Sequence, residues 1–264
     1  MDVKALSYTS KRSDLVVHLI DVHAHLTDPS FQDLPEVLHR AAAAGVKKII
    51  MSITDPAEFV RAREMLSMAP ECLHLTIGFD PSNLSEERYT RFEELVSLGG
   101  MVGIGEVGLD HFYVRDHSQR SVQAAFFRSS IRLAIKKDLP LVVHSRSAGR
   151  DALEVLYSEG AERVLMHAFD GKSGDALEAA KRGFFFSIPA SVVYSVQKQK
   201  LVRLLPLESL MLETDSPVLS PLRGERNEPA NLVFAARKIS EIKRVELGEV
   251  VRTTAEKAKE FFRI

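Results

Sequence analysis

The chain has 264 residues, 45% of them hydrophobic, and its 35 lysines and arginines nearly balance its 36 aspartates and glutamates. A single α/β barrel typically has about 250 residues, so one domain is predicted over residues 1–264. The sequence has no uninterrupted apolar run of the roughly 20 residues that cross a bilayer, and the balanced charge excludes a global positive field for a long nucleic acid.

The first segment of the chain is polar and has no hydrophobic period. It carries Lys4, Lys11, Arg12 and Asp14 without an apolar block between them, so it lacks the layout of a secretory signal. Residues 1–15 are therefore predicted to be a peripheral N-terminal extension, and the protein is predicted to be cytoplasmic.

Apolar runs alternate with stretches of helical spacing along the rest of the chain. The predicted strands are residues 16–25, 47–53, 73–79, 101–108, 139–145, 163–169, 184–190 and 209–216. The predicted helices are residues 34–45, 55–68, 85–98, 118–137, 148–158, 173–182 and 197–205, followed by two amphipathic stretches that reach Ile264. This alternation is typical of βα units with parallel strands.

The eightfold repeat predicts an α/β protein of the closed (β/α)8 type, the TIM barrel. Most of the strands are too continuously apolar to be half exposed, as expected for a parallel sheet that helices cover. An open, doubly wound sheet is the alternative. Its glycine-rich dinucleotide-binding turn is absent after the first predicted strand, where histidines stand instead.

The first predicted strand ends in the string DVHAH, in which every second side chain points to the same side. Asp21, His23 and His25 therefore project together. Two neutral imidazoles beside a carboxylate form part of a metal site. Asp21 is expected to hydrogen-bond a ligand or the backbone rather than to coordinate an ion.

Residues of metal-ligand type recur at the C-terminal ends of the other strands. The full set is His23, His25, Glu106, His144, His167 and Asp215. In a barrel these strand ends meet at one mouth, which is where such enzymes have their active sites. The six side chains are therefore predicted to form one metal centre.

Four imidazoles and two carboxylates exceed the three or four protein ligands of one catalytic zinc, so two divalent ions are predicted. Glu106 is the best bridging carboxylate, and Asp215 is predicted to orient the attacking water or accept its proton. The ligand set suits Zn²⁺ or Mn²⁺, and Mg²⁺ is compatible with the carboxylates. The ligands assigned to one ion are His23, His25 and Asp215, and those assigned to the other are His144 and His167.

Cations and histidines in the loops after the strands are candidates for substrate contact. Arg146 suits bidentate binding of a phosphate, and a salt bridge that braces the mouth is an equally good interpretation. His111 lies just beyond Glu106, and Arg226 lies in the last loop. Asp110 is predicted to be structural.

Several strings in the chain resemble the TatD-type metal-dependent deoxyribonucleases of the amidohydrolase superfamily. They are DVHAHL, GEVGLD, VVHSR, MHAF, LETDSP and RNEP, in the order and spacing of that family. The resemblance implies a barrel, a dinuclear metal site at the same six residues, and hydrolysis of phosphodiester bonds, often from a 3′ end. It also implies that Asn227 and Glu228, in RNEP, shape the rim of the pocket. The chain departs from the family at Ala168, where cysteine is commoner.

The predicted function is a divalent-metal-dependent hydrolase that cleaves phosphodiester bonds in DNA with a metal-activated water. The balanced charge favours single-stranded ends or short oligonucleotides as partners, and no membrane or obligate protein partner is predicted. One alternative is a dinuclear amidohydrolase acting on a small amide or ester, because the same electrostatics suit either reaction. The other is a non-catalytic, metal-stabilised binding protein.

Overall fold

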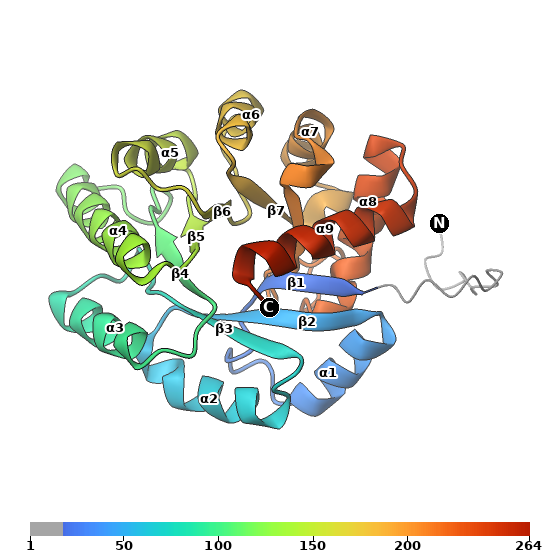
Figure 1. Cartoon of the computed structure of the whole chain (residues 1–264), viewed down its shortest axis with the longest axis horizontal. Coiled ribbons are helices and arrows are strands. Elements are labelled where there is room, and N and C mark those ends of the chain that lie inside the picture. Colours follow the sequence, from blue (N-terminus) through green and yellow to red (C-terminus); the bar gives the residue numbers. More distant parts are fainter. Residues whose placement is uncertain (1–17) are drawn as a thin grey trace.

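Eight parallel strands follow one another around a barrel in chain order, and helices surround them (Figure 1). The structure is a computed structural model that describes residues 18–264, and the predicted peripheral extension, residues 1–15, lies outside them. The strands are β1 (Leu19–Ala24), β2 (Val46–Ile53), β3 (Leu73–Ile77), β4 (Gly103–Gly108), β5 (Leu141–His144), β6 (Val164–Met166), β7 (Phe185–Pro189) and β8 (Leu210–Glu213). The (β/α)8 barrel predicted from the sequence is confirmed.

The helices occupy the segments with helical hydrophobic spacing. They are α1 (Leu34–Ala43), α2 (Phe59–Met68), α3 (Glu86–Leu98), α4 (His117–Lys137), α5 (Gly149–Ser158), α6 (Ser173–Lys181), α7 (Val196–Leu204), α8 (Leu232–Lys243) and α9 (Leu247–Phe262). Local capping marks several of these ends. Asp116 accepts hydrogen bonds from the first-turn amides of α4, and Ser85 does the same for α3.

Within residues 18–264, no helix has both the length and the apolar character that crossing a bilayer requires.

Hydrogen bonds between β1 and the end of β8 close the barrel. The backbone bonds run from the His25 amide to the Ser216 carbonyl at 2.8 Å and from the Asp215 amide to the His23 carbonyl at 2.9 Å. The Asp21 carboxylate, fully buried, accepts from the Thr214 amide at 2.9 Å and from the Thr214 hydroxyl at 2.5 Å. Asp21 thus joins the first and last strands, as expected for a residue that supports the ligands without being one.

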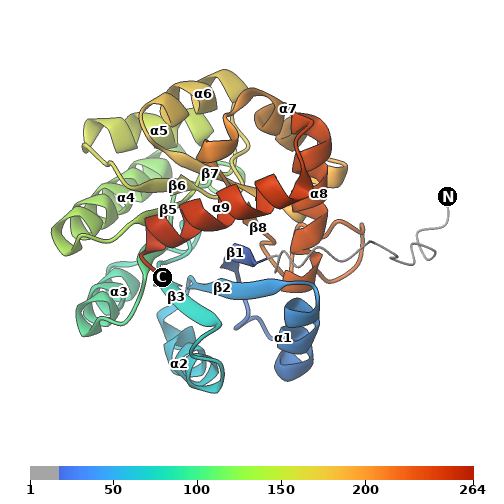
Figure 2. The same cartoon turned by 45° about the vertical axis from the view of Figure 1, so that its right-hand side comes forward.

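The N-terminal end of the barrel is covered by α9, which crosses it in both views (Figures 1 and 2). Its Phe261 and Phe262 belong to a buried cluster with inward-facing strand residues such as Ile20 and Met211. Because this end is packed with apolar side chains, the polar residues at the carboxyl ends of the strands are left to form the functional face.

Two glycines let β4 approach its neighbours at distances that no side chain permits. A Cβ atom on Gly108 would lie 2.0 Å from the His144 carbonyl oxygen, and one on Gly78 would lie 2.1 Å from the Glu106 carbonyl oxygen. Gly108 also has a φ of 148°, which L-residues rarely adopt. These close approaches set the positions of Glu106 and His144, both of which are predicted ligands.

Candidate metal centre

The six side chains predicted to bind metal meet at the C-terminal mouth of the barrel. Their potential ligand atoms fall into three overlapping triplets, and within each triplet all the atoms lie within 4.8 Å of one another. The triplets are His23, His25 and Glu106; Glu106, His144 and His167; and His23, His167 and Asp215. The alternation of side chains along β1 and the shared direction of the parallel strands account for this convergence.

The two carboxylate oxygens of Glu106 face different pairs of histidines. Oε2 lies 3.3 Å from His23 Nε2 and 3.4 Å from His25 Nε2. Oε1 contacts His144 Nδ1 and lies 3.8 Å from His167 Nε2. A carboxylate with one oxygen toward each pair has the geometry of a bridging ligand between two ions.

Asp215 lies close to three of the same four histidines, namely His23, His25 and His167. Its Oδ1 is 3.4 Å from His25 Nε2, and its Oδ2 is 3.8 Å from His167 Nε2. The backbone of Asp215 is left-handed, with a φ of 55°, a conformation that aspartate tolerates better than most residues other than glycine. This carboxylate can therefore reach either half of the site.

The electrostatics of the site favour a bound cation. Burial alone would raise the pKa of Glu106, but His144 and His167 hold it well below its usual value, so Glu106 stays ionised. Burial lowers the pKa of His144 and His167, yet the surrounding carboxylates raise it to about 10 and about 9, respectively. The mouth therefore attracts positive charge, which divalent ions can supply.

The arrangement of donor atoms also fits metal ions. His23 Nε2 and His25 Nε2 lie 3.1 Å apart with both facing the carboxylates, and the His23 ring stacks on that of His167 at a centroid distance of 3.8 Å. Imidazole nitrogens and carboxylate oxygens that converge on one space are the donors of dinuclear hydrolytic sites. The residues present therefore fit two divalent ions.

Two further carboxylates, not predicted for the site, hold the histidines on the β5 and β6 side. Glu213, fully buried on β8, lies 2.7 Å from His167 Nδ1, and Asp110 lies 3.0 Å from His144 Nε2. Carboxylates in this position fix the orientation of a ligand imidazole and raise its basicity. Glu213 precedes Asp215 by two residues. Because side chains two residues apart on a strand point to the same side, the reasoning used for His23 and His25 could also have predicted Glu213 near the site.

Replacement of Glu213 by glutamine is expected to weaken metal binding by about 10–100-fold, because His167 loses the carboxylate that orients it. The dissociation constant, measured by titrating metal into chelator-treated protein, checks this expectation. Glu94→Gln, an exposed carboxylate on α3, is the matched control. An unchanged metal affinity together with a lower melting temperature would show that Glu213 only stabilises the fold.

Arg146, the predicted phosphate contact, lines a cavity at the mouth together with His144 and His167. Its guanidinium lies 4.2 Å from the ring centroid of Phe112 and 5.0 Å from that of Tyr113. Within residues 18–264 it forms no salt bridge, in contrast to the alternative interpretation of this residue. Stacking on aromatic rings leaves its hydrogen-bond donors free for a ligand.

Two other predicted substrate residues use their polar groups to hold loops. His111 Nδ1 lies 3.3 Å from an oxygen of Asp151 on α5. Asn227 is fully buried, and its amide donates to the carbonyls of Thr214 and Val218, each at 2.8 Å. A buried amide with its donors satisfied supports the loop after β8 rather than contacting substrate.

The remaining two, Arg226 and Glu228, belong to an ion-pair network beside the mouth. Arg226 pairs with Asp33 at 2.7 Å, and Glu228 pairs with Arg40 of α1 at 2.7 Å. This network ties the β8 loop to the β1 loop. It shapes the rim of the mouth, and the charges of both residues are already matched.

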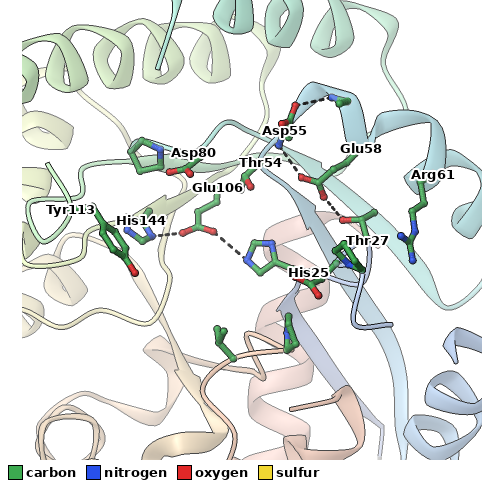
Figure 3. Close-up of a pocket in the computed structure, with 16 residues that line it drawn as sticks. His25, Thr27, Thr54, Asp55, Glu58, Arg61, Asp80, Glu106, Tyr113 and His144 are labelled. Carbon is green, nitrogen blue, oxygen red and sulfur yellow. Dashed lines mark hydrogen bonds and ion pairs between the residues drawn. The ribbon is translucent and has the colours of Figure 1, made fainter. Parts of the chain in front are cut away.

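Two cavities open on either side of the predicted ligands. Cavity A, of about 750 Å³, is shown in Figure 3; among the residues that line it are His25, Glu106, His144, Asp28, Asp55, Glu58, Arg61 and Asp80. Cavity B, of about 470 Å³, is lined by residues that include His144, His167, Asp215, Arg146, Lys198 and Asp170. Tyr113 and Val218 line both cavities. The two cavities are therefore neighbours at the predicted metal centre.

Comparisons with known proteins agree across almost the whole chain. A sequence family described as TatD related DNase matches residues 20–263. A human protein named Deoxyribonuclease TATDN3 is 38% identical over 263 residues, which cover 93% of this chain and 95% of that protein. An uncharacterized metal-dependent hydrolase of Bacillus subtilis, YabD, is 36% identical over 256 residues, covering 93% and 99%. The crystal structure of YJJV, a TatD homolog from Escherichia coli, superposes with a TM-score of 0.87 at 26% identity, covering 95% of this chain and 100% of that one.

Proposed function

This chain belongs to the TatD family of metal-dependent hydrolases, and from that membership we propose that it is a deoxyribonuclease with two divalent ions at its mouth. The observation that carries the proposal is Glu106, whose two oxygens face two separate pairs of histidines. The substrate proposed is single-stranded DNA or a short oligonucleotide, shortened from its 3′ end. The cytoplasmic location predicted from the sequence is part of the same proposal.

The proposed ligand sets divide the site into two halves that share Glu106. One half has His23, His25 and Asp215, and the other has His144 and His167. Ions bound there would lower the pKa of a coordinated water and offset the negative charge on the phosphoryl oxygens. Zn²⁺ and Mn²⁺ suit the imidazole nitrogens, and the carboxylates also admit Mg²⁺.

The protein's own groups position the reactants in this proposal. Asp215, with one oxygen toward each half of the site, accepts the proton of the attacking water. Water adds to phosphorus, the bond from phosphorus to the leaving sugar oxygen breaks, and a phosphate monoester and an alcohol result. Arg146, on the wall of cavity B, binds the phosphate that precedes the scissile one.

Single-stranded DNA fits the mouth better than a duplex does. The chain's balanced charge supplies no net positive field to hold two phosphate backbones. Tyr113 is 64% exposed between the two cavities, and an exposed aromatic ring stacks on an unpaired base.

The proposal is tested with the full chain, divalent-metal salts and 5′-labelled single-stranded DNA. We expect a ladder of products shortened from the 3′ end, abolished by a chelator and restored by adding back metal. Metal analysis of protein purified without chelator is expected to find two ions per chain. Activity confined to p-nitrophenyl esters or small amides, or tight DNA binding without turnover, would contradict the proposal.

A further inference from the structure

The two cavities beside the predicted metal centre differ in charge. Apart from the predicted ligands, cavity A has four carboxylates and one cation among its lining residues, namely Asp28, Asp55, Glu58, Asp80 and Arg61. Cavity B has two cations and one carboxylate, namely Arg146, Lys198 and Asp170. The ammonium of Lys198 is buried and donates to the carbonyls of Ala168 and Phe169, so a strand of DNA that crosses the centre meets Arg146 on one side and an excess of carboxylates on the other.

Asp28 and Asp80 of cavity A form no salt bridge among residues 18–264, and the charges of His25 and Arg61 act on Asp28 only through space. Asp28 accepts a hydrogen bond from the Ser30 amide at 2.8 Å, and Asp80 accepts from the amide and hydroxyl of Ser82, both at 2.7 Å. In each case Oδ1 takes these bonds, so the negative charge of the side chain remains available to the cavity.

The other two carboxylates are engaged with the protein. Asp55 pairs with Arg88 of α3 at 3.1 Å. Glu58 accepts from the Asp55 amide at 3.1 Å and from the Thr27 hydroxyl. Asp55 is thus ion-paired, whereas Glu58 accepts only neutral donors, so the repulsion that a bound anion meets in cavity A comes from Asp28, Asp80 and Glu58.

Cavity A can hold one nucleoside next to the metal centre. Its volume is about 750 Å³, and Figure 3 shows His25, Glu106 and His144 together on one side of it, with Asp80 next to Glu106. Tyr113 stands at its edge toward cavity B, where a base can stack. A nucleoside carries no charge, so an acidic cavity accepts it without repulsion.

We infer that cavity A receives the terminal nucleoside of the strand and accepts it with a free hydroxyl but not with a terminal phosphate. The inference rests on the proposed nuclease function and deepens it. The internal phosphates lie over cavity B, the scissile phosphate lies at the metal centre, and a phosphate beyond it would face Asp28 and Asp80. Like charges placed together in a recessed site strongly disfavour binding. A strand that continues past the scissile phosphate is disfavoured for the same reason, so cleavage is confined to ends.

The test compares two 5′-labelled single-stranded oligonucleotides that differ only in a 3′-hydroxyl or a 3′-phosphate. A second pair, labelled at the 3′ end, differs only at the 5′ end and identifies the end that is attacked. At the attacked end, the wild-type protein is expected to remove the first nucleotide about tenfold more slowly when a phosphate is present. The ratio of the rate on a hydroxyl end to the rate on a phosphate end is expected to become smaller at high salt, because salt screens charges that are exposed to solvent.

The variants Asp28→Asn and Asp80→Asn remove charge and keep the oxygen that accepts the loop hydrogen bonds. Each variant is expected to lower the ratio of the hydroxyl-end rate to the phosphate-end rate by about threefold, and the double variant is expected to lower this ratio further. Asp138→Asn is the matched control, because Asp138 is exposed between α4 and β5, at the opposite end of the barrel. Its ratio is expected to equal that of the wild type.

The possible outcomes distinguish a failure of this inference from a failure of the proposed nuclease function. Equal rates on hydroxyl and phosphate ends, or a ratio that both variants and the double variant leave unchanged, would overturn the inference while nuclease activity stands. Cleavage at internal linkages that is insensitive to the terminal group would also overturn it. If neither oligonucleotide pair is degraded, the proposed function itself fails.

Discussion

Replacement of Glu106 by glutamine is expected to reduce nuclease activity on the order of a thousandfold or more, because the centre loses its bridging charge. In the structure, Oε2 faces His23 and His25 while Oε1 faces His144 and His167. Glutamine has nearly the same shape but no negative charge, and its nitrogen cannot coordinate an ion. Metal content is therefore expected to fall below two ions per chain.

The rate of nucleotide release and metal analysis of the same preparation check this expectation together. Glu94→Gln, which removes an exposed carboxylate from α3, is the control and is expected to keep both activity and metal. A Glu106→Gln variant with two ions and wild-type activity would show that the bridge lies elsewhere.

Asp215→Asn is expected to lower kcat by about 10²–10⁴-fold even at metal concentrations that fill the site. The asparagine oxygen can still face the histidines, so the geometry is retained. The amide cannot accept the proton of an attacking water, so the chemical step slows. Substrate binding does not depend on that proton, and KM is expected to change little.

Steady-state kinetics on single-stranded DNA, with metal analysis alongside, separate the two possible contributions of Asp215. Asp138→Asn, at the other end of the barrel, controls for the loss of one negative charge. If metal content falls in proportion to kcat in Asp215→Asn, the carboxylate acts mainly by holding an ion. A proton-accepting role is contradicted in that case.

The barrel and the meeting of six side chains could be predicted from the sequence because each depends on local patterns. Apolar runs define the strands, and the alternation within DVHAH places His23 and His25 on one side. Parallel strands then bring their carboxyl ends together whatever the distance along the chain. Glu106 and Asp215, which are 109 residues apart in the sequence, were placed in one site on this basis alone.

The supporting contacts could not be predicted because they depend on which side chains meet across the fold. Glu228 pairs with Arg40, which is 188 residues away, and no periodicity links the two. Asp110 supports its own loop through the amides of Phe112 and Tyr113, as expected for a structural residue, and it also contacts His144. That Asp110 binds both its own loop and His144 can be recognised only from the three-dimensional structure.

The closure of the barrel by β1 and β8 also determines when during synthesis the metal centre can form. His23 is among the first described residues to leave the ribosome, whereas Asp215 follows the last strand. At about 5–20 residues per second, translation separates these two residues by roughly 10–40 s. Glu106 is synthesised partway through that interval, but Asp215 is added only at its end, so the set of six predicted ligands stays incomplete until then. The predicted metal centre can therefore be completed only in a nearly finished chain.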